Sequence, residues 1–265
     1  MSERIFDEIK RIFPDPSSIN VLSWLRIRSV SYLKSRAEGK EIPEEKREIL
    51  EDLFKAYSPE RLREAFNRAS NLLDAQKSAL LSCGYDVFDF LATTTSRLIV
   101  GMASEVFGKQ IFEVGLSWDP ILNLPYIPGS SLKGAFRSHL ERERPDLVPL
   151  LGSKSEASLV IFLDSYPVRS RYNLIVPEVT TPMYREQDGK IREVEAEPKP
   201  VFYPVINTDV TFRILIGGFL SNPPRPLMRD KGRELRNQLG QFLKEVLKKG
   251  IGAKTLVGYG LMEIP

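Results

Sequence analysis

Apolar residues recur with the period of an α-helix through the first third of the chain, and turn-forming residues separate the segments. One segment ends at the Pro14-Asp15-Pro16 turn, and another covers residues 21–37. Pro43 and Ser58 mark the starts of two more segments, because proline and serine favour the first positions of helices. We therefore expect helices up to residue 90 and a helical N-terminal extension over residues 1–93.

From residue 94 onward the pattern changes to short runs with strand character. These runs are 96–103, 110–116, 157–163, 210–216 and 259–264. Two amphipathic helical segments interrupt them, one after Ser131 and one over 233–248. Apart from one additional strand, the order is strand, helix, strand, strand, helix, strand, which is that of a ferredoxin-like or RRM-like fold. The pattern therefore predicts an α+β domain over residues 94–265.

Two segments lie outside this plan, and we expect them to be inserted hairpins. The first, residues 110–127, leads into the predicted helix after Ser131. The second, residues 172–207, has five prolines and an Asp188-Gly189 turn between charged residues. These features favour a projecting hairpin over a core element.

The composition narrows the classes of function. The net charge is +3, so any surface for nucleic acid has to be local. The single cysteine, Cys83, and the single histidine, His139, exclude a disulfide framework and a Cys/His zinc cluster. We predict no bound metal, no cofactor and no membrane span, and we expect a cytoplasmic protein without a signal peptide. The 28% of charged residues is typical of thermophilic proteins.

The most informative motif is Leu-Pro-Tyr-Ile-Pro-Gly-Ser-Ser-Leu-Lys-Gly-Ala-Phe-Arg at residues 124–137. Leu132 begins an apolar stripe that continues along one helical face. Lys133 and Arg137 follow near the helix start, where free N–H groups and the dipole favour an anion. The lysine is followed by glycine, so the motif is not a P-loop, which requires Ser or Thr there. The motif predicts a helix start that holds a phosphate, and an ordinary capped surface helix fits the same residues.

A second motif precedes the last predicted strand. Residues 248–260 contain four glycines, three lysines and a threonine. A helix that ends at Gly250 explains this glycine. It does not explain Gly252 or Lys254. Glycine lets a backbone come close to a ligand and expose its N–H groups to phosphates. We expect this glycine-rich loop to face the helix start that carries Lys133 and Arg137.

Taken together, the two motifs resemble those of the RAMP proteins of CRISPR effector complexes. Within that superfamily the chain is most similar to the sixth RAMP subunit of the type III-B (Cmr) complex, and the resemblance covers residues 94–265. It rests on the two motifs and on further matches at 97–101, 161–167, 179–184, 204–205 and 250–255.

The resemblance implies a non-catalytic subunit that binds the guide RNA (crRNA), a single-stranded RNA, in antiviral defence. Such a subunit lies toward the 3′ end of the crRNA, beside the slicing backbone subunit and other Cmr subunits. A protruding hairpin called a thumb, here residues 180–199, separates guide bases. The RNA-binding positions that the resemblance and the motifs give are Ser130, Ser131, Lys133, Arg137, Tyr184, Gly252, Lys254 and Thr255.

Catalytic candidates are few. Slicing RAMP subunits carry an aspartate before the Pro-Gly-Ser-Ser motif, and Gly115 stands near that position here. Glu113 and Asp119 are the acidic neighbours, and each is more typical of a solvated loop. His139 falls on the apolar helical face, which predicts a packed core histidine. We therefore expect that the protein is not an enzyme. The alternatives to a crRNA-binding subunit are a RAMP endoribonuclease that processes CRISPR RNA and a free-standing RNA-binding module.

Overall fold

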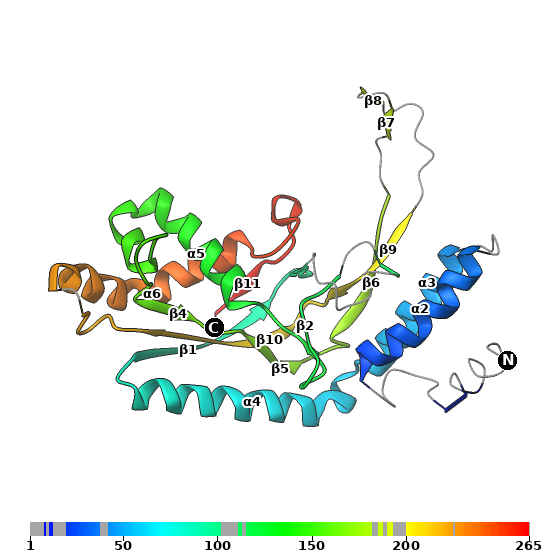
Figure 1. Ribbon diagram of the computed structural model, residues 1–265, viewed down its shortest axis with the longest axis horizontal. Helices are drawn as coiled ribbons and strands as arrows, with labels where there is room; N and C mark the ends of the chain where they lie inside the picture. The colour runs from blue at the N-terminus through cyan, green and yellow to red at the C-terminus, as the bar shows by residue number, and fades with distance from the viewer. Residues whose placement is uncertain are drawn as a thin grey trace.

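The computed structural model describes residues 8, 11–12, 20–37, 42–101, 111–112, 115–181, 185–187, 190–192, 200–224 and 226–264. Helices and strands are mixed along this part of the chain, as the pattern predicts for an α+β protein (Figure 1). The α-helices are α2 (Val21–Ala37), α3 (Ile42–Ala56), α4 (Pro59–Ser82), α5 (Gly129–Glu143) and α6 (Arg229–Lys249). Short 3₁₀ helices are η1 (Pro145–Leu151), η2 (Pro226–Met228) and η3 (Thr255–Val257).

A five-stranded antiparallel sheet forms the centre. Its order is β11 (Met262–Glu263), β1 (Asp86–Thr94), β10 (Val210–Gly218) and β4 (Val160–Phe162), and β5 (Tyr166–Ser170) also pairs with β10. The long central pair runs from Asp86 opposite Gly218 to Thr93 opposite Thr211. Along the chain, α5 follows β1 and precedes β4, while α6 connects β10 to β11. Both helices therefore link strands of the same sheet.

Helices cover both faces of this sheet (Figure 1). Successive side chains of β1 point to opposite faces because the strand period is two. Phe90 points toward α6, where a Cβ on Gly240 would lie 3.4 Å from its ring, and Asp89 points toward α4. The layer between the sheet and helices α5 and α6 is apolar. Its fully buried members include Leu132, Phe136, Leu140, Leu239, Leu243, Ile214 and Ile216.

The opposite face is covered by α4, which crosses β1, β10 and β5. This helix buries Leu62, Ala65, Phe66, Ala69 and Leu73. Ion pairs add to the apolar contact, since the Arg213 guanidinium lies 2.8 Å from Asp74 of α4 and 2.7 Å from Asp89 of β1. Lys77 lies 2.9 Å from the same Asp89 carboxylate. Helix α4 therefore covers much of this face of the sheet.

A two-stranded ribbon rises away from the sheet (Figure 1). It consists of β6 (Ile175–Thr180) and β9 (Val201–Ile206), which pair antiparallel along their whole length. β7 (Arg185–Gln187) and β8 (Lys190–Arg192) pair farther along the same segment. Helix α3 packs against β6 and β9, and α2 packs against α3. A short hairpin of β2 (Trp118–Asp119) and β3 (Leu124–Pro125) precedes α5.

The structure confirms strands within 157–163, 210–216 and 259–264 and helices after Ser131 and over 233–248. Other expectations about the strands differ from the structure. β1 lies at 86–94, inside the part expected to be helical, because the turn at Gly84 (φ 79°) ends α4 without a longer break in sequence. Residues 96–101 form no strand apart from an isolated bridge between Leu98 and Ile206.

The cause of the second error is tertiary. The carbonyls of Ile99 and Val100 accept hydrogen bonds from loop amides, those of Ala253 and Ser117, each at 2.8 Å. Of the expected strand 110–116, the described residues 111–112 and 115–116 also lie outside strands. The division of the chain at residue 93 stays a prediction. Within the described ranges, no helix is both long enough and apolar enough to cross a membrane.

Candidate nucleic-acid interface

A cleft of about 710 Å³ lies between α5, the end of α6 and the glycine-rich loop at residues 250–260. We call it the α5–loop cleft. Its polar lining includes Ser131, Ser138, Arg142, Lys249 and Thr255. Hydroxyl donors and two cations thus face one space, which suits a ligand that carries negative charge.

The start of α5 is fixed by its contact with β4. A Cβ at Gly129 would lie 2.1 Å from the carbonyl oxygen of Phe162, so only glycine allows this approach. The Gly129 N–H donates to Asp164 Oδ1 at 2.8 Å. An anion from the chain itself therefore already occupies part of the helix start where the sequence predicts a phosphate.

The glycine-rich loop is held by backbone contacts. Gly250 ends α6 at φ 93°, and Gly252 has φ 86°, a region that L side chains rarely adopt. A Cβ at Gly252 would also lie 2.2 Å from the Ile99 carbonyl oxygen. The neighbouring Ala253 N–H donates to that carbonyl at 2.8 Å. These contacts attach the loop to the segment that follows β1.

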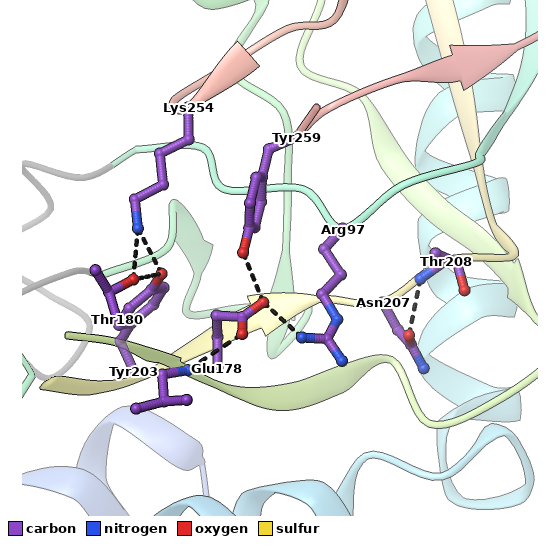
Figure 2. Close-up of polar contacts among 9 residues, drawn as sticks. Arg97, Glu178, Thr180, Tyr203, Asn207, Thr208, Lys254 and Tyr259 are labelled. Carbon is purple, nitrogen blue, oxygen red and sulfur yellow. Dashed lines mark hydrogen bonds and ion pairs between the residues drawn. The ribbon is translucent and has the colours of Figure 1, made fainter. Parts of the chain in front are cut away.

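Side-chain contacts connect the same loop to the base of the β6–β9 ribbon (Figure 2). Lys254 Nζ donates to Thr180 Oγ1 at 2.8 Å and to the Tyr203 hydroxyl at 2.7 Å. The ammonium also lies 4.9 Å from the centroid of the Tyr203 ring, within the range of a cation–π interaction. The Lys254 ammonium is therefore directed at the ribbon and away from the α5–loop cleft.

Glu178 of β6 makes a second connection to this region. Its Oε2 accepts hydrogen bonds from Arg97 and from the Tyr259 hydroxyl, the latter at 2.7 Å (Figure 2). Burial alone would raise the pKa of Glu178, but the hydrogen bonds from Arg97 and Tyr259 outweigh it and lower the pKa below its ordinary value. Burial and the same carboxylate raise the pKa of Tyr259.

This carboxylate is expected to make stability depend on pH. A lowered pKa in the folded state means that the contribution is complete above the unfolded pKa, near 4.5, and is lost as the pH falls through the folded value. Glu178→Gln should lower the free energy of unfolding by about 1.5 kcal/mol at pH 7, the contribution of one hydrogen bond to a charged group. Denaturant titrations from pH 3 to 7 measure the difference between the two proteins.

Glu51→Gln is the matched control, because Glu51 forms an exposed i,i+4 pair with Arg47. It should change stability by less than about 0.5 kcal/mol. If Glu178→Gln lowers the free energy of unfolding by the same amount at pH 3 as at pH 7, the charge of the Glu178 carboxylate does not contribute to stability.

His139 is buried, as its place on the apolar face of α5 predicts, with 1% of its surface exposed. It also borders the α5–loop cleft, where Lys249 Nζ lies 3.3 Å from Nδ1. Glu245 Oε2 lies 3.2 Å from Nε2. Burial, followed by the charge of Lys249, lowers the pKa of His139 below its ordinary value. Because an ammonium can only donate, Nδ1 accepts the hydrogen bond from Lys249 and so holds this lysine at the cleft.

Lys133 and Arg137 do not face the glycine-rich loop, which corrects the expectation from sequence. They line a second groove of about 500 Å³, together with Gly152 and Lys154. The reason is the helical period, which turns each residue by about 100° and so separates Lys133 and Arg137 from Ser131 and Ser138. Arg137 Nη1 donates to the Gly152 carbonyl at 3.0 Å. Burial, followed by the charge of Arg137, lowers the pKa of Lys133.

The model of the RAMP superfamily matches residues 91–263. The chain belongs to the RAMP superfamily. The Cmr6 subunit of the CRISPR Cmr system of Saccharolobus solfataricus is 34% identical over 238 residues, which cover 88% of this chain and 76% of that protein. The Cmr6 subunit of Pyrococcus furiosus is 22% identical, over 63% of this chain and 65% of that protein.

A solved structure is similar along nearly the whole chain. It is a chain from the cryo-EM structure of the type III-B Cmr-beta bound to cognate target RNA, with a TM-score of 0.78 and 28% identity. The match covers 99% of this chain and 96% of that chain. The similarity therefore includes the N-terminal helices of this RAMP protein, for which the sequence motifs give no assignment.

In this RAMP protein some of the predicted RNA-binding residues line the α5–loop cleft and others lie outside it. Ser131, Gly252 and Thr255 line it, whereas Ser130 is exposed outside its lining. Tyr184 and most of the predicted thumb lie outside the described residues. Sequence reasoning did not assign Arg142 or Lys249 to the site, although Arg142 lies on the same face of α5 as Ser131 and Lys249 is one of the three lysines of the motif at residues 248–260.

The acidic candidates for catalysis gain no support from geometry. Glu113 lies outside the described residues. Asp119 Oδ1 accepts hydrogen bonds from the N–H groups of Ile121 and Leu122, at 2.8 and 2.9 Å. Its Oδ2 accepts from the Tyr166 hydroxyl at 2.8 Å. Oδ1 therefore stabilises the β2–β3 turn, and Oδ2 connects this turn to β5.

Proposed function

We propose that this chain is a non-catalytic, guide-RNA-binding subunit of a type III-B CRISPR complex, and that it holds crRNA phosphates in the α5–loop cleft. The relatives support the assembly, since they are named as Cmr subunits or come from a Cmr complex bound to RNA. The observation that carries the RNA site is the convergence of Arg142 and Lys249 with three hydroxyl groups in one cleft. Charge-assisted hydrogen bonds from such groups are the usual ligands of RNA phosphates.

The proposal includes a ferredoxin-like fold with inserted hairpins. The strand order β11, β1, β10, β4 supports it, as do the helical connections through α5 and α6. In an RRM, RNA bases stack on the open face of such a sheet. Here α4 covers that face and is tied to it by Arg213. The RNA strand is therefore assigned to the α5–loop cleft.

The β6–β9 ribbon is assigned as the base of a thumb. Its strands pair along their full length, and the contacts of Lys254 and Glu178 join it to the glycine-rich loop. In this assignment the ribbon contacts the slicing backbone subunit and the guide between the two subunits. This subunit would then protect the 3′ part of the guide.

A binding experiment on the full chain tests the RNA site. Lys249→Ala should weaken binding of single-stranded RNA about tenfold, because one charge-assisted contact is lost. It should also reduce the slope of log affinity against log salt by about 0.7. Fluorescence anisotropy at several salt concentrations measures both quantities, and gel analysis of the same samples should show intact RNA.

Lys248→Ala is the matched control, since this exposed lysine neighbours Lys249 and is not part of the cleft lining. Equal slopes for the two variants would contradict the phosphate site. Cleavage of CRISPR RNA by the purified chain, abolished by His139→Ala in a protein that still folds, would favour the endoribonuclease alternative.

A further inference from the structure

Two aliphatic side chains stand at the tip of the glycine-rich loop. Leu256 is 100% exposed and Val257 is 72% exposed, both within η3. Scattered exposed apolar residues are ordinary on protein surfaces. Leu256 differs because it lines the α5–loop cleft that also contains Arg142 and Lys249. Cations and a bare aliphatic group therefore border the same space.

The loop holds Leu256 in a defined position. The Val257 N–H donates to the Lys254 carbonyl at 3.1 Å, and the Gly258 N–H donates to the Thr255 carbonyl at 3.0 Å. Lys254 and Gly258 both adopt the left-handed conformation, at φ 60° and 89°. The bonds from Lys254 Nζ to the ribbon fix one end of this turn. The side chain of Leu256 is thus presented by a constrained turn.

We propose that Leu256 packs against a nucleobase of the RNA strand whose phosphates lie in the α5–loop cleft. The inference rests on the proposed function and adds a base contact to the phosphate contacts of the cleft. A strand that alternates anionic groups with flat apolar rings satisfies both the cations and the leucine. In an A-form duplex the base faces are stacked on one another, so Leu256 favours single-stranded RNA.

The test uses Leu256→Ala in the full chain and single-stranded RNA as the probe. Because the side chain is fully exposed, its loss does not affect the core. Affinity should fall about fivefold, the lower end of the range for an aromatic side chain stacked on a base, because leucine contacts a base over a smaller area. The salt slope should stay unchanged, because no phosphate contact is removed. The control is Leu227→Ala, in which a side chain that is 95% exposed on η2 is removed.

An abasic RNA separates base contact from other causes. Wild-type protein and Leu256→Ala should bind it with equal affinity, since the group that Leu256 contacts is absent. Equal losses on normal and abasic RNA would overturn the inference. So would unchanged RNA affinity together with reduced co-purification of other Cmr subunits, because Leu256 would then contact protein.

The two proposals fail in different ways. If wild-type protein does not bind RNA, the proposed function fails and the inference fails with it. A different result is that Lys249→Ala weakens RNA binding while Leu256→Ala and Leu227→Ala both bind like wild type. The phosphate site in the cleft would then be supported, and the proposed base contact would be wrong.

Discussion

Gly129→Ala is expected to lower the free energy of unfolding by about 3 kcal/mol, at the upper end of the range for overpacking a dense core. The new Cβ would lie 2.1 Å from the Phe162 carbonyl oxygen and 2.8 Å from its carbonyl carbon. Both are backbone atoms of β4, so relief requires that α5 move away from the sheet. Such a movement would also lengthen the hydrogen bond from the Gly129 N–H to Asp164.

Gly134→Ala provides the comparison within the same helix. Outside the backbone of the helix itself and the two neighbouring residues, no heavy atom lies within 4 Å of a Cβ at this position, so alanine fits without a clash. Because alanine also has the higher helix propensity, this variant should be more stable than wild type by about 0.5–1 kcal/mol. Denaturant unfolding followed by circular dichroism measures both changes. Equal stability of the two variants would show that the close contact between α5 and β4 does not constrain the fold.

The sequence predicts the elements whose signal is local. α5 and α6 carry apolar stripes with a helical period, and β10 is an apolar run between turn residues, so their positions follow from the pattern. β1 was missed because only three residues, with Gly84 as their single turn signal, separate it from the 24-residue helix α4. Residues 98–100 resemble a strand in composition, but Leu98 forms only an isolated bridge with Ile206, and the backbone partners of Ile99 and Val100 are in loops.

The candidate site was predictable only in part, for a physical reason. The two motifs at residues 124–137 and 248–260 do meet at one cleft. Which side chains point into it depends on the rotation of α5 about its axis, and that rotation is set by the burial of Phe136 and His139. The same rotation directs Lys133 into the second groove. The contacts of Lys254 with Thr180 and Tyr203 could not be predicted, because these partners are more than fifty residues away.

The central claim is that RNA phosphates lie in the α5–loop cleft. The direct test is the affinity for single-stranded RNA of Arg142→Glu/Lys249→Glu compared with Lys133→Glu/Lys154→Glu, which makes the same charge change in the second groove. Two lost phosphate contacts predict about 100-fold weaker binding for the first pair. The affinity of the second double variant should fall only several-fold, because its substitutions change the overall electrostatic field of the protein but remove no phosphate contact. A larger loss for the second pair, or wild-type affinity for the first, would contradict the account.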